Sequence, residues 1–228
     1  MAISIDTVYQ KVLAIANKEQ RGYITPQEFN LFANQAQLDI FEQYFYDLNQ
    51  FSRMKGNSTE YADMVDLLNE KISRFASVDP VSYSTAHSVF SLPGTLYRLG
   101  TVIYKEKEVE EVQDNDLLYL NMSPLAKPSE NRPVYVQRDN GLAVFPDSIT
   151  ADVKISWIRK PDPVEWGYIV VGGKAMYEPG RSVNFLLHQT EETELVIQIL
   201  KLAGIQMEND LYQIASQEES KGIQQEKQ

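Results

Sequence analysis

The sequence predicts an α+β protein: a helical bundle built from both ends of the chain, with a mainly antiparallel β region inserted between them. Apolar residues recur at helical spacing through residues 5–76. From Val78 this periodicity stops, and proline, glycine and strand-like runs take over. A last amphipathic stretch, FLLHQTEETELVIQILKLAG, returns at residues 185–204. The expected segments are 1–77 for the first part of the bundle, 78–180 for the β region with a hairpin arm, and 181–228 for the completing helices and a polar tail.

Composition bounds the classes of function. A chain of 228 residues is long enough for one large domain or two small ones. Its net charge of −11 argues against tight nucleic-acid binding. A negative surface repels phosphates, so DNA could still pass close to it without binding. The absence of cysteine excludes disulfides and thiolate catalysis. No apolar run approaches the ~18 residues of a membrane span, and the first residues lack a signal-peptide pattern, so we expect no membrane association.

Three helices are expected in the first segment, at residues 5–20, 25–51 and 60–76. The second has the strongest start signal, because Thr25, Pro26 and Glu28 form a capping box with proline at the first helical position. This helix is aromatic on more than one side and therefore needs partners on two faces. Tyr44 and Phe45 are its candidate interface residues.

The β region begins with strands expected in His87–Pro93 and Leu96–Lys105. A short helix capped by Asp114 should follow at residues 114–123. The Asn140-Gly141 pair then predicts a β-hairpin with a type I′ turn between two apolar runs. A further strand should place Val153, Ile155 and Trp157 on one face.

A second hairpin is expected at residues 168–177, with Gly172-Gly173 at its tip. Its strands are apolar on both faces, which suits an arm covered by something else. A buried edge hairpin would produce the same pattern, so both interpretations stay open. If it is an arm, the candidate interface residues are Trp166, Tyr168, Ile169, Val170, Val171, Met176 and Tyr177.

The last amphipathic stretch predicts the helix on which the bundle is organised. Thr190 is its expected cap, with acidic residues in the first turn, where the helix dipole favours them. Leu195, Ile199 and Leu202 form its apolar stripe, and Gly204 is a natural stop. A second segment at residues 207–220 and a polar tail should follow.

Sequence patterns for catalysis and metal binding are weak. Residues 17–28 have the glycine and glutamate spacing of an EF-hand loop, but Arg21 stands where calcium needs an oxygen ligand. His87 and His188 show no metal-ligand spacing. The carboxylate runs at 106–111 and 191–194 look like solvated faces, although a paired-carboxylate hydrolase stays an alternative. We expect no metal, no cofactor and no enzymatic activity.

Several stretches resemble virion proteins of tailed bacteriophages. ETELVIQILKLAGIQMEND at residues 192–210 is similar to the C-terminal helices of head-to-tail connector proteins, the adaptors or ring proteins below the portal. LYRLGTVIYKEKEVEEV, RPVYVQRDNGLAVFP and VKISWIRKPDPVEWGY resemble structural proteins of crAss-like and podovirus-type phages.

The resemblance implies a structural protein made in the host cytoplasm and located in the virion. It implies a homo-oligomeric ring of twelve copies that contacts the portal and tail proteins and guides DNA without binding it specifically. It supplies no catalytic residues. Three alternatives stay open: another head or tail-shaft component, a small carboxylate-dependent hydrolase, and a cellular scaffold that binds one partner through residues 168–177.

Overall fold

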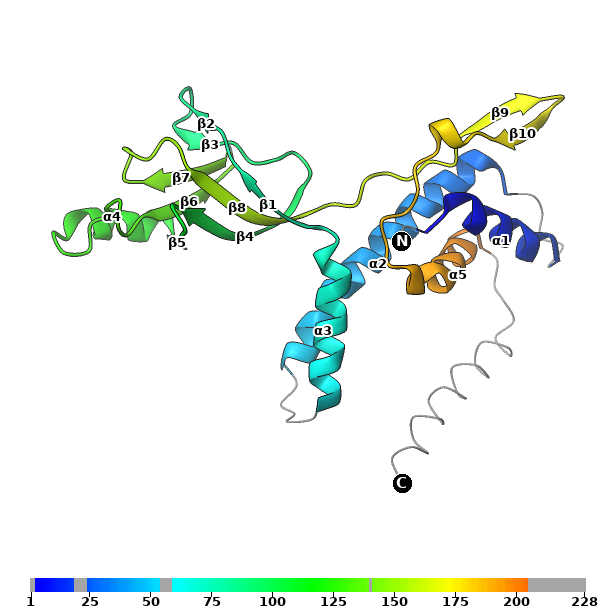
Figure 1. The fold of residues 1–228 in the computed structure, drawn as a ribbon, viewed down its shortest axis with the longest axis horizontal. Coiled ribbons are helices and arrows are strands. Elements are labelled where there is room, and N and C mark those ends of the chain that lie inside the picture. The colour runs from blue at the N-terminus through cyan, green and yellow to red at the C-terminus, as the bar shows by residue number, and fades with distance from the viewer. Residues whose placement is uncertain (1–2, 19–23, 54–58, 140, 205–228) are drawn as a thin grey trace. The chain divides into compact units, whose positions relative to one another are not determined.

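The computed structural model describes residues 3–18, 24–53, 59–139 and 141–204. The chain divides into two compact units. Residues 1–61 and 161–228 form what we call the helical unit, and residues 62–160 form the sheet unit. Helices together with a mostly antiparallel sheet confirm the α+β prediction (Figure 1).

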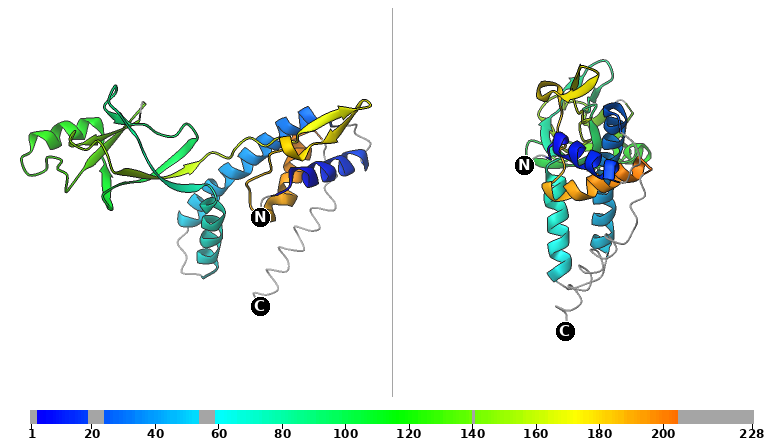
Figure 2. Two further views of the ribbon diagram at one scale, coloured as in Figure 1. Left: turned by 45° about the horizontal axis from the view of Figure 1, so that its top comes forward. Right: turned by 90° about the vertical axis from the view of Figure 1, so that its right-hand side faces the viewer.

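The helical unit is organised around three helices, α1 (Ile5–Lys18), α2 (Pro26–Arg53) and α5 (Glu192–Leu202). Helix α5 packs against both α1 and α2, as the views in Figure 2 show. The contributing faces repeat at three- and four-residue intervals, as an apolar helical stripe requires. Their buried side chains include Ile5, Val8, Val12 and Ala16 of α1, Phe29, Ala33, Ala36 and Ile40 of α2, and Leu195, Val196, Ile199 and Leu200 of α5.

Helix α2 starts as the sequence predicts. The Thr25 N–H donates to Glu28 Oε2 at 3.0 Å, and the Glu28 N–H donates to Thr25 Oγ1 at 3.3 Å. This reciprocal pair is the predicted capping box. The backbone and side-chain hydrogen bonds from Thr25 hold the pKa of the Glu28 carboxyl below its usual value.

Helix α5 starts differently. His188 takes the capping role, because its Nδ1 accepts from the Thr190 N–H at 3.3 Å at the start of a short 3₁₀ turn, η2 (Gln189–Glu191). Thr190 therefore lies inside the turn and is not the cap. The other end matches the prediction: Gly204 has φ 74° and its N–H donates to the Lys201 carbonyl at 3.1 Å. Leu202 is 39% exposed and does not belong to the buried stripe.

The sheet unit contains most of α3 (Thr59–Ser73), the short helix α4 (Asp114–Met122) and an eight-stranded sheet in the order β1-β8-β4-β5-β6-β7-β3-β2. Only the β5–β6 pair is parallel. Phe90 of β3 and Ile155 of β8 share one core cluster although their strands lie near opposite ends of this order, so the sheet curls around a single core (Figure 1). The strands are β1 (Ala76–Pro80), β2 (Tyr83–Ser84), β3 (Val89–Phe90), β4 (Leu96–Tyr104), β5 (Lys107–Glu111), β6 (Val134–Arg138), β7 (Gly141–Phe145) and β8 (Val153–Arg159).

Two details of the sheet unit correct the sequence prediction. Gln113, without a side-chain hydrogen bond, is the residue before α4, so Asp114 is the first helical residue and not the cap. Gly141 pairs with Arg138, so it belongs to β7 and is not a central residue of the turn. The β6–β7 hairpin itself is confirmed.

Other strand predictions are confirmed or shortened. The three residues Val153, Ile155 and Trp157 are all buried on one face of β8, as predicted. The strand expected in residues 87–93 is only the two residues of β3.

The unit boundaries also differ from the expected segments. The sheet unit starts within α3, at residue 62, and ends at residue 160, so the 168–177 hairpin belongs to the helical unit. The helix end expected at residues 19–20, Arg21 and the segment expected at 207–220 lie outside the described residues. None of the described helices is long and apolar enough to cross a membrane.

Candidate interaction surface

The hairpin at residues 168–177 forms as predicted and exposes four large apolar side chains, Ile169, Val170, Val171 and Met176. Strands β9 (Tyr168–Val171) and β10 (Lys174–Tyr177) pair with each other and with no other described strand. Gly172 and Gly173 have φ 58° and 77°, the left-handed values that a two-residue turn requires. We call residues 168–177 the arm; its tip ends away from the helices (Figure 1).

Both faces of the outer half of the arm are apolar. Side chains alternate along a strand, so Ile169, Val171 and Met176 share one face, and they are 46–54% exposed. Val170 lies on the other face and is 67% exposed. The arm therefore presents hydrophobic side chains to solvent on two sides.

The base of the arm is fixed by Trp166. This side chain is 3% exposed, and its ring centroid lies 4.4 Å from that of Tyr9 on α1. The rings of Tyr168 and Tyr177, the first and last residues of the arm, lie 5.9 and 5.7 Å from it. Its indole Nε1 donates to Asp6 Oδ1 at 3.0 Å. An aromatic cluster thus ties both strands to α1.

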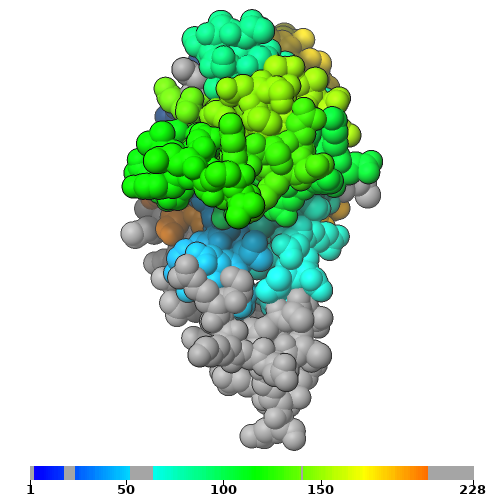
Figure 3. Space-filling model, turned by 90° about the vertical axis from the view of Figure 1, so that its left-hand side faces the viewer, coloured from blue at the N-terminus to red at the C-terminus, as the bar shows by residue number. Residues whose placement is uncertain are grey.

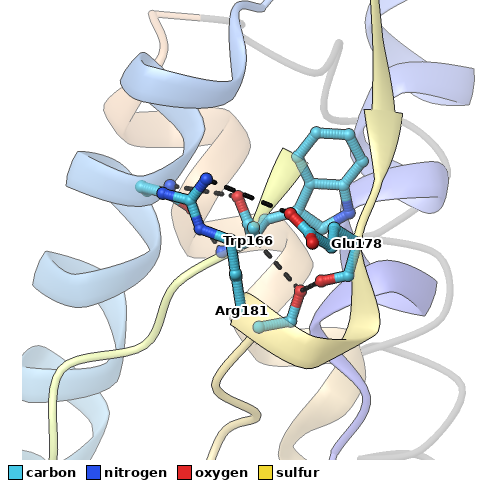
Figure 4. A network of polar contacts seen from close by, with 6 residues as sticks. Trp166, Glu178 and Arg181 are labelled. Atoms are coloured by element: carbon cyan, nitrogen blue, oxygen red, sulfur yellow. Dashed lines mark hydrogen bonds and ion pairs between the residues drawn. The ribbon is translucent and has the colours of Figure 1, made fainter. Parts of the chain in front are cut away.

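Polar contacts join the chain segment before the arm to the segment after it (Figure 4). The Gly167 N–H donates to Ser182 Oγ at 3.0 Å, and that hydroxyl donates to the Glu178 carbonyl at 2.8 Å. The Glu178 carboxylate lies 4.0 Å from the Arg181 guanidinium. A Cβ at Gly167 would lie 2.7 Å from the Cβ of Arg181, so the close approach of the two chain segments requires glycine there.

Side-chain amides of α2 hold the extended segment that leads into the arm. Asn34 accepts from the Val164 N–H and donates to the Val164 carbonyl, both at 2.9 Å. Asn30 makes the same pair of contacts with the backbone of Trp166, at 2.8 and 3.4 Å. Each amide satisfies one donor and one acceptor, as a neighbouring β-strand would.

Gln37 extends this series, because its Nε2 donates to the Asp162 carbonyl at 2.9 Å. We call Asn30, Asn34 and Gln37 the amide ladder. Their spacing of four and three residues places them on one face of α2, opposite alternate residues of the extended segment. The pattern N-x-x-x-N-x-x-Q is readable in the sequence, but nothing local indicates which segment it binds.

Two of the predicted interface residues are buried and correct that prediction. Trp166 and Tyr44 are 3% and 4% exposed, so their side chains are not at the surface of this chain. Phe45 is half-buried, with its ring 5.1 Å from that of Phe41. The six predicted residues that form the arm itself are all at least partly accessible: Tyr168, Ile169, Val170, Val171, Met176 and Tyr177.

Sequence reasoning missed a second apolar surface, which lies in the sheet unit. Helix α4 buries Leu117 against Val134 and Val136. Its outer side exposes what we call the α4 surface, whose residues recur at helical spacing. These residues are Leu118 (65% exposed), Tyr119 (72%), Met122 (80%) and, just beyond the helix, Leu125 (99%). The segment that contains α4 is part of the green region facing the viewer in Figure 3. The only sequence signal is the run LLYLNM, which is apolar on every side.

The carboxylates of the sheet unit surround open clefts. One cleft of about 560 Å³ is lined by Glu110, Glu111 and Asp116 among others. The Glu110 side chain is 61% exposed and lies 3.3 Å from Arg132. A general acid needs shielding from water to hold its proton at neutral pH, and this open site does not provide it. In the part of the chain that the structure describes, no three histidine or carboxylate side chains are arranged to hold a metal ion.

Tyr135 is the one strongly perturbed group near these clefts. Burial, assisted by the Glu111 carboxylate 3.3 Å from its hydroxyl, raises the pKa of Tyr135 to about 12. Both causes favour the neutral phenol, so this residue acts as a hydrogen-bond donor at neutral pH.

No protein-family model matches the chain, and no curated protein is significantly similar to it.

Proposed function

We propose that this chain is a structural virion protein that assembles into a ring at the head-to-tail junction of a tailed phage. The observation that carries the proposal is the arm, which exposes apolar side chains on both faces while its base is fixed by Trp166 and the amide ladder. A ring subunit needs such a rigidly mounted element, because each copy must contact a neighbour at a defined angle.

Two further properties support this proposal. The net charge of −11 suits a channel through which DNA passes without binding. The stretch 192–210 resembles connector proteins, which implies a ring of twelve copies between portal and tail proteins, and the stretches 96–112, 132–146 and 153–168 resemble structural proteins of crAss-like and podovirus-type phages. The subunit would be made in the host cytoplasm and would function in the virion.

Electron microscopy of purified virions carrying a tagged copy of this chain tests the proposal. We expect the tag in a ring between capsid and tail. A tag in the capsid or along the tail shaft would show that the chain is another structural component and not a connector. Absence of the tag from the particle would overturn the proposal that the chain is a virion protein. Native mass spectrometry adds a second readout, because a stable monomer, both alone and with the portal protein, would contradict ring formation.

A further inference from the structure

The arm has the properties of an element that another surface covers. A two-stranded hairpin is marginally stable in water unless a further strand or a helix packs on it. Among the described residues, the contacts that hold the arm lie at its base, where Tyr168 and Tyr177 contact Trp166 and the Gln27 amide donates to the Tyr168 hydroxyl at 3.5 Å. Beyond the base, Val170 and Val171 are 67% and 54% exposed, and Lys174 is the only charged side chain there. Leaving this apolar surface in contact with water costs free energy.

The α4 surface also exposes apolar side chains that a contact with another surface would cover. Leu117 is the one buried residue of α4, while Met122 and Leu125 are 80% and 99% exposed. A helix that is apolar on both sides normally packs between two layers. Exposed apolar patches of this kind in a soluble chain mark contact surfaces.

Charge favours contact between these two surfaces. Lys174, beside the glycine turn, is the only charged residue of the arm. The first turn of α4 carries Asp114 and Asp116, next to Glu110 and Glu111 of the open cleft. Arg138 pairs with Asp114 and Arg132 pairs with Glu110, so the four carboxylates exceed the two arginines and the rim stays negative. A basic tip would therefore approach an acidic rim while the apolar residues of both surfaces cover each other.

We propose that the arm of one copy docks on the α4 surface of a second copy of this chain. The two surfaces are different patches on different units, so each copy can contact two neighbours head to tail. Repetition of this heterologous contact closes a ring when the rotation between neighbours completes a full turn. This inference deepens the proposed function and rests on it only for the identity of the complete assembly. A two-fold dimer would instead pair one patch with itself, or would place the arm of each copy on the α4 surface of the other and stop at two copies.

Cysteine cross-linking tests this docking directly, because the chain contains no native cysteine. A tagged Val170→Cys chain and an untagged Met122→Cys chain are mixed, oxidised with copper phenanthroline and separated without reductant. We expect a disulfide-linked heterodimer from the mixture and a ladder of oligomers from the doubly substituted chain. Leu31→Cys is the matched control, since Leu31 is 71% exposed on α2 and should not link to Met122→Cys.

Each outcome of this experiment decides the question. A fast-migrating monomer from the doubly substituted chain, without a ladder, would place the arm on the α4 surface of its own copy and overturn the proposal. Oligomers in native mass spectrometry without the heterodimer would overturn the docking and leave the ring intact. A heterodimer from a chain that is absent from virions would support the docking while the virion function fails.

Charge substitutions provide a second test that does not depend on oxidation. Val170→Asp should raise the dissociation constant of the oligomer by more than about tenfold, because docking would bury an unpaired carboxylate. Adding Met122→Lys should restore part of the loss, and Leu31→Asp should leave assembly unchanged. Circular dichroism establishes that each variant is folded. Equal assembly of Val170→Asp and the original chain would contradict the proposal.

Discussion

At the scale of the residue, single side chains close the ends of elements and join distant segments. Thr25 and Glu28 close the start of α2, and His188 closes the start of η2. Trp166 does more, because one indole contacts α1 through Tyr9 and Asp6 and also contacts the base of the arm. Such residues orient the exposed surfaces without belonging to them.

The capping box predicts a pH dependence. The pKa of Glu28 is lower in the folded chain than its usual value of 4.5, so its contribution to stability is complete above that value and is lost as the pH falls through the folded pKa. We expect an NMR titration to place the Glu28 carboxyl below 4.5 and Thr25→Ala to return it towards 4.5, with a loss of about 1 kcal/mol of stability. Alanine keeps the backbone N–H of residue 25, which is the larger cause of the lowered pKa, so the return should be partial. An unchanged Glu28 pKa in Thr25→Ala would contradict a contribution from the Thr25 hydroxyl.

The turn between β4 and β5 predicts an order of stability. Lys105 and Glu106 have φ 45° and 66°, in the left-handed region that side chains with a Cβ adopt at a cost. We expect Glu106→Gly to be at least as stable as the original chain and Glu106→Val to be less stable, the two variants differing by about 1–2 kcal/mol in urea unfolding. A valine variant as stable as the glycine variant would show that the turn relaxes.

At the scale of the element, one face of helix α2 makes hydrogen bonds to an extended segment that a neighbouring β-strand would otherwise make. The amide ladder of α2 satisfies the backbone of Val164 and Trp166, which no described strand pairs along this stretch. The backbone groups on the other side of this segment are used at Glu165, which pairs with Val183. The extended segment before the arm is therefore bonded on both sides, and the arm leaves it in a fixed direction.

Removing one amide of the amide ladder should weaken the attachment of the extended segment to α2. Asn34→Ala deletes both contacts with Val164 and leaves a partly buried donor and acceptor unsatisfied, so we expect a loss of about 1–3 kcal/mol in chemical denaturation. Hydrogen exchange of the Val164 amide should become faster. Gln35→Ala is the control on the same helix, because Gln35 is exposed and its amide donates to the exposed Asp39, and it should change stability by less than about 0.5 kcal/mol.

At the scale of the whole molecule, one unit is inserted into the sequence of the other. The chain passes from the helical unit to the sheet unit after residue 61 and returns at residue 161. Within the described parts of the chain, each unit exposes a cluster of apolar side chains, the arm on the helical unit and the α4 surface on the sheet unit. A chain of this kind can offer a different contact to each of two neighbours, which ring formation requires.

The continuous stretch of the sheet unit should fold by itself. All eleven side chains of its core cluster lie between Phe90 and Trp157, so a fragment of residues 62–160 contains the complete cluster. We expect this fragment to show a β-rich circular dichroism spectrum and a cooperative thermal transition. A gradual transition in the fragment, beside a cooperative one in the full chain, would show that the sheet unit depends on the rest of the chain.

The sequence by itself determined features that depend on neighbours a few residues away. The start of α2 at Thr25, the stop at Gly204 and the turn at Gly172-Gly173 follow from capping and turn chemistry, which act within about four residues. The shared face of Ile155 and Trp157 follows from strand alternation. These were readable because a local pattern is sufficient to specify them.

The tertiary structure decided features that join distant residues. Asn34 and Val164 are 130 positions apart, and no local pattern indicates that this amide binds that backbone. The burial of Trp166, the parallel pairing of β5 with β6 and the exposure of the α4 surface likewise depend on which elements become neighbours. The physical reason is that packing assigns each apolar side chain to the core or the surface only after the chain has folded, so a stretch that is apolar on every side shows its free face only in the folded molecule.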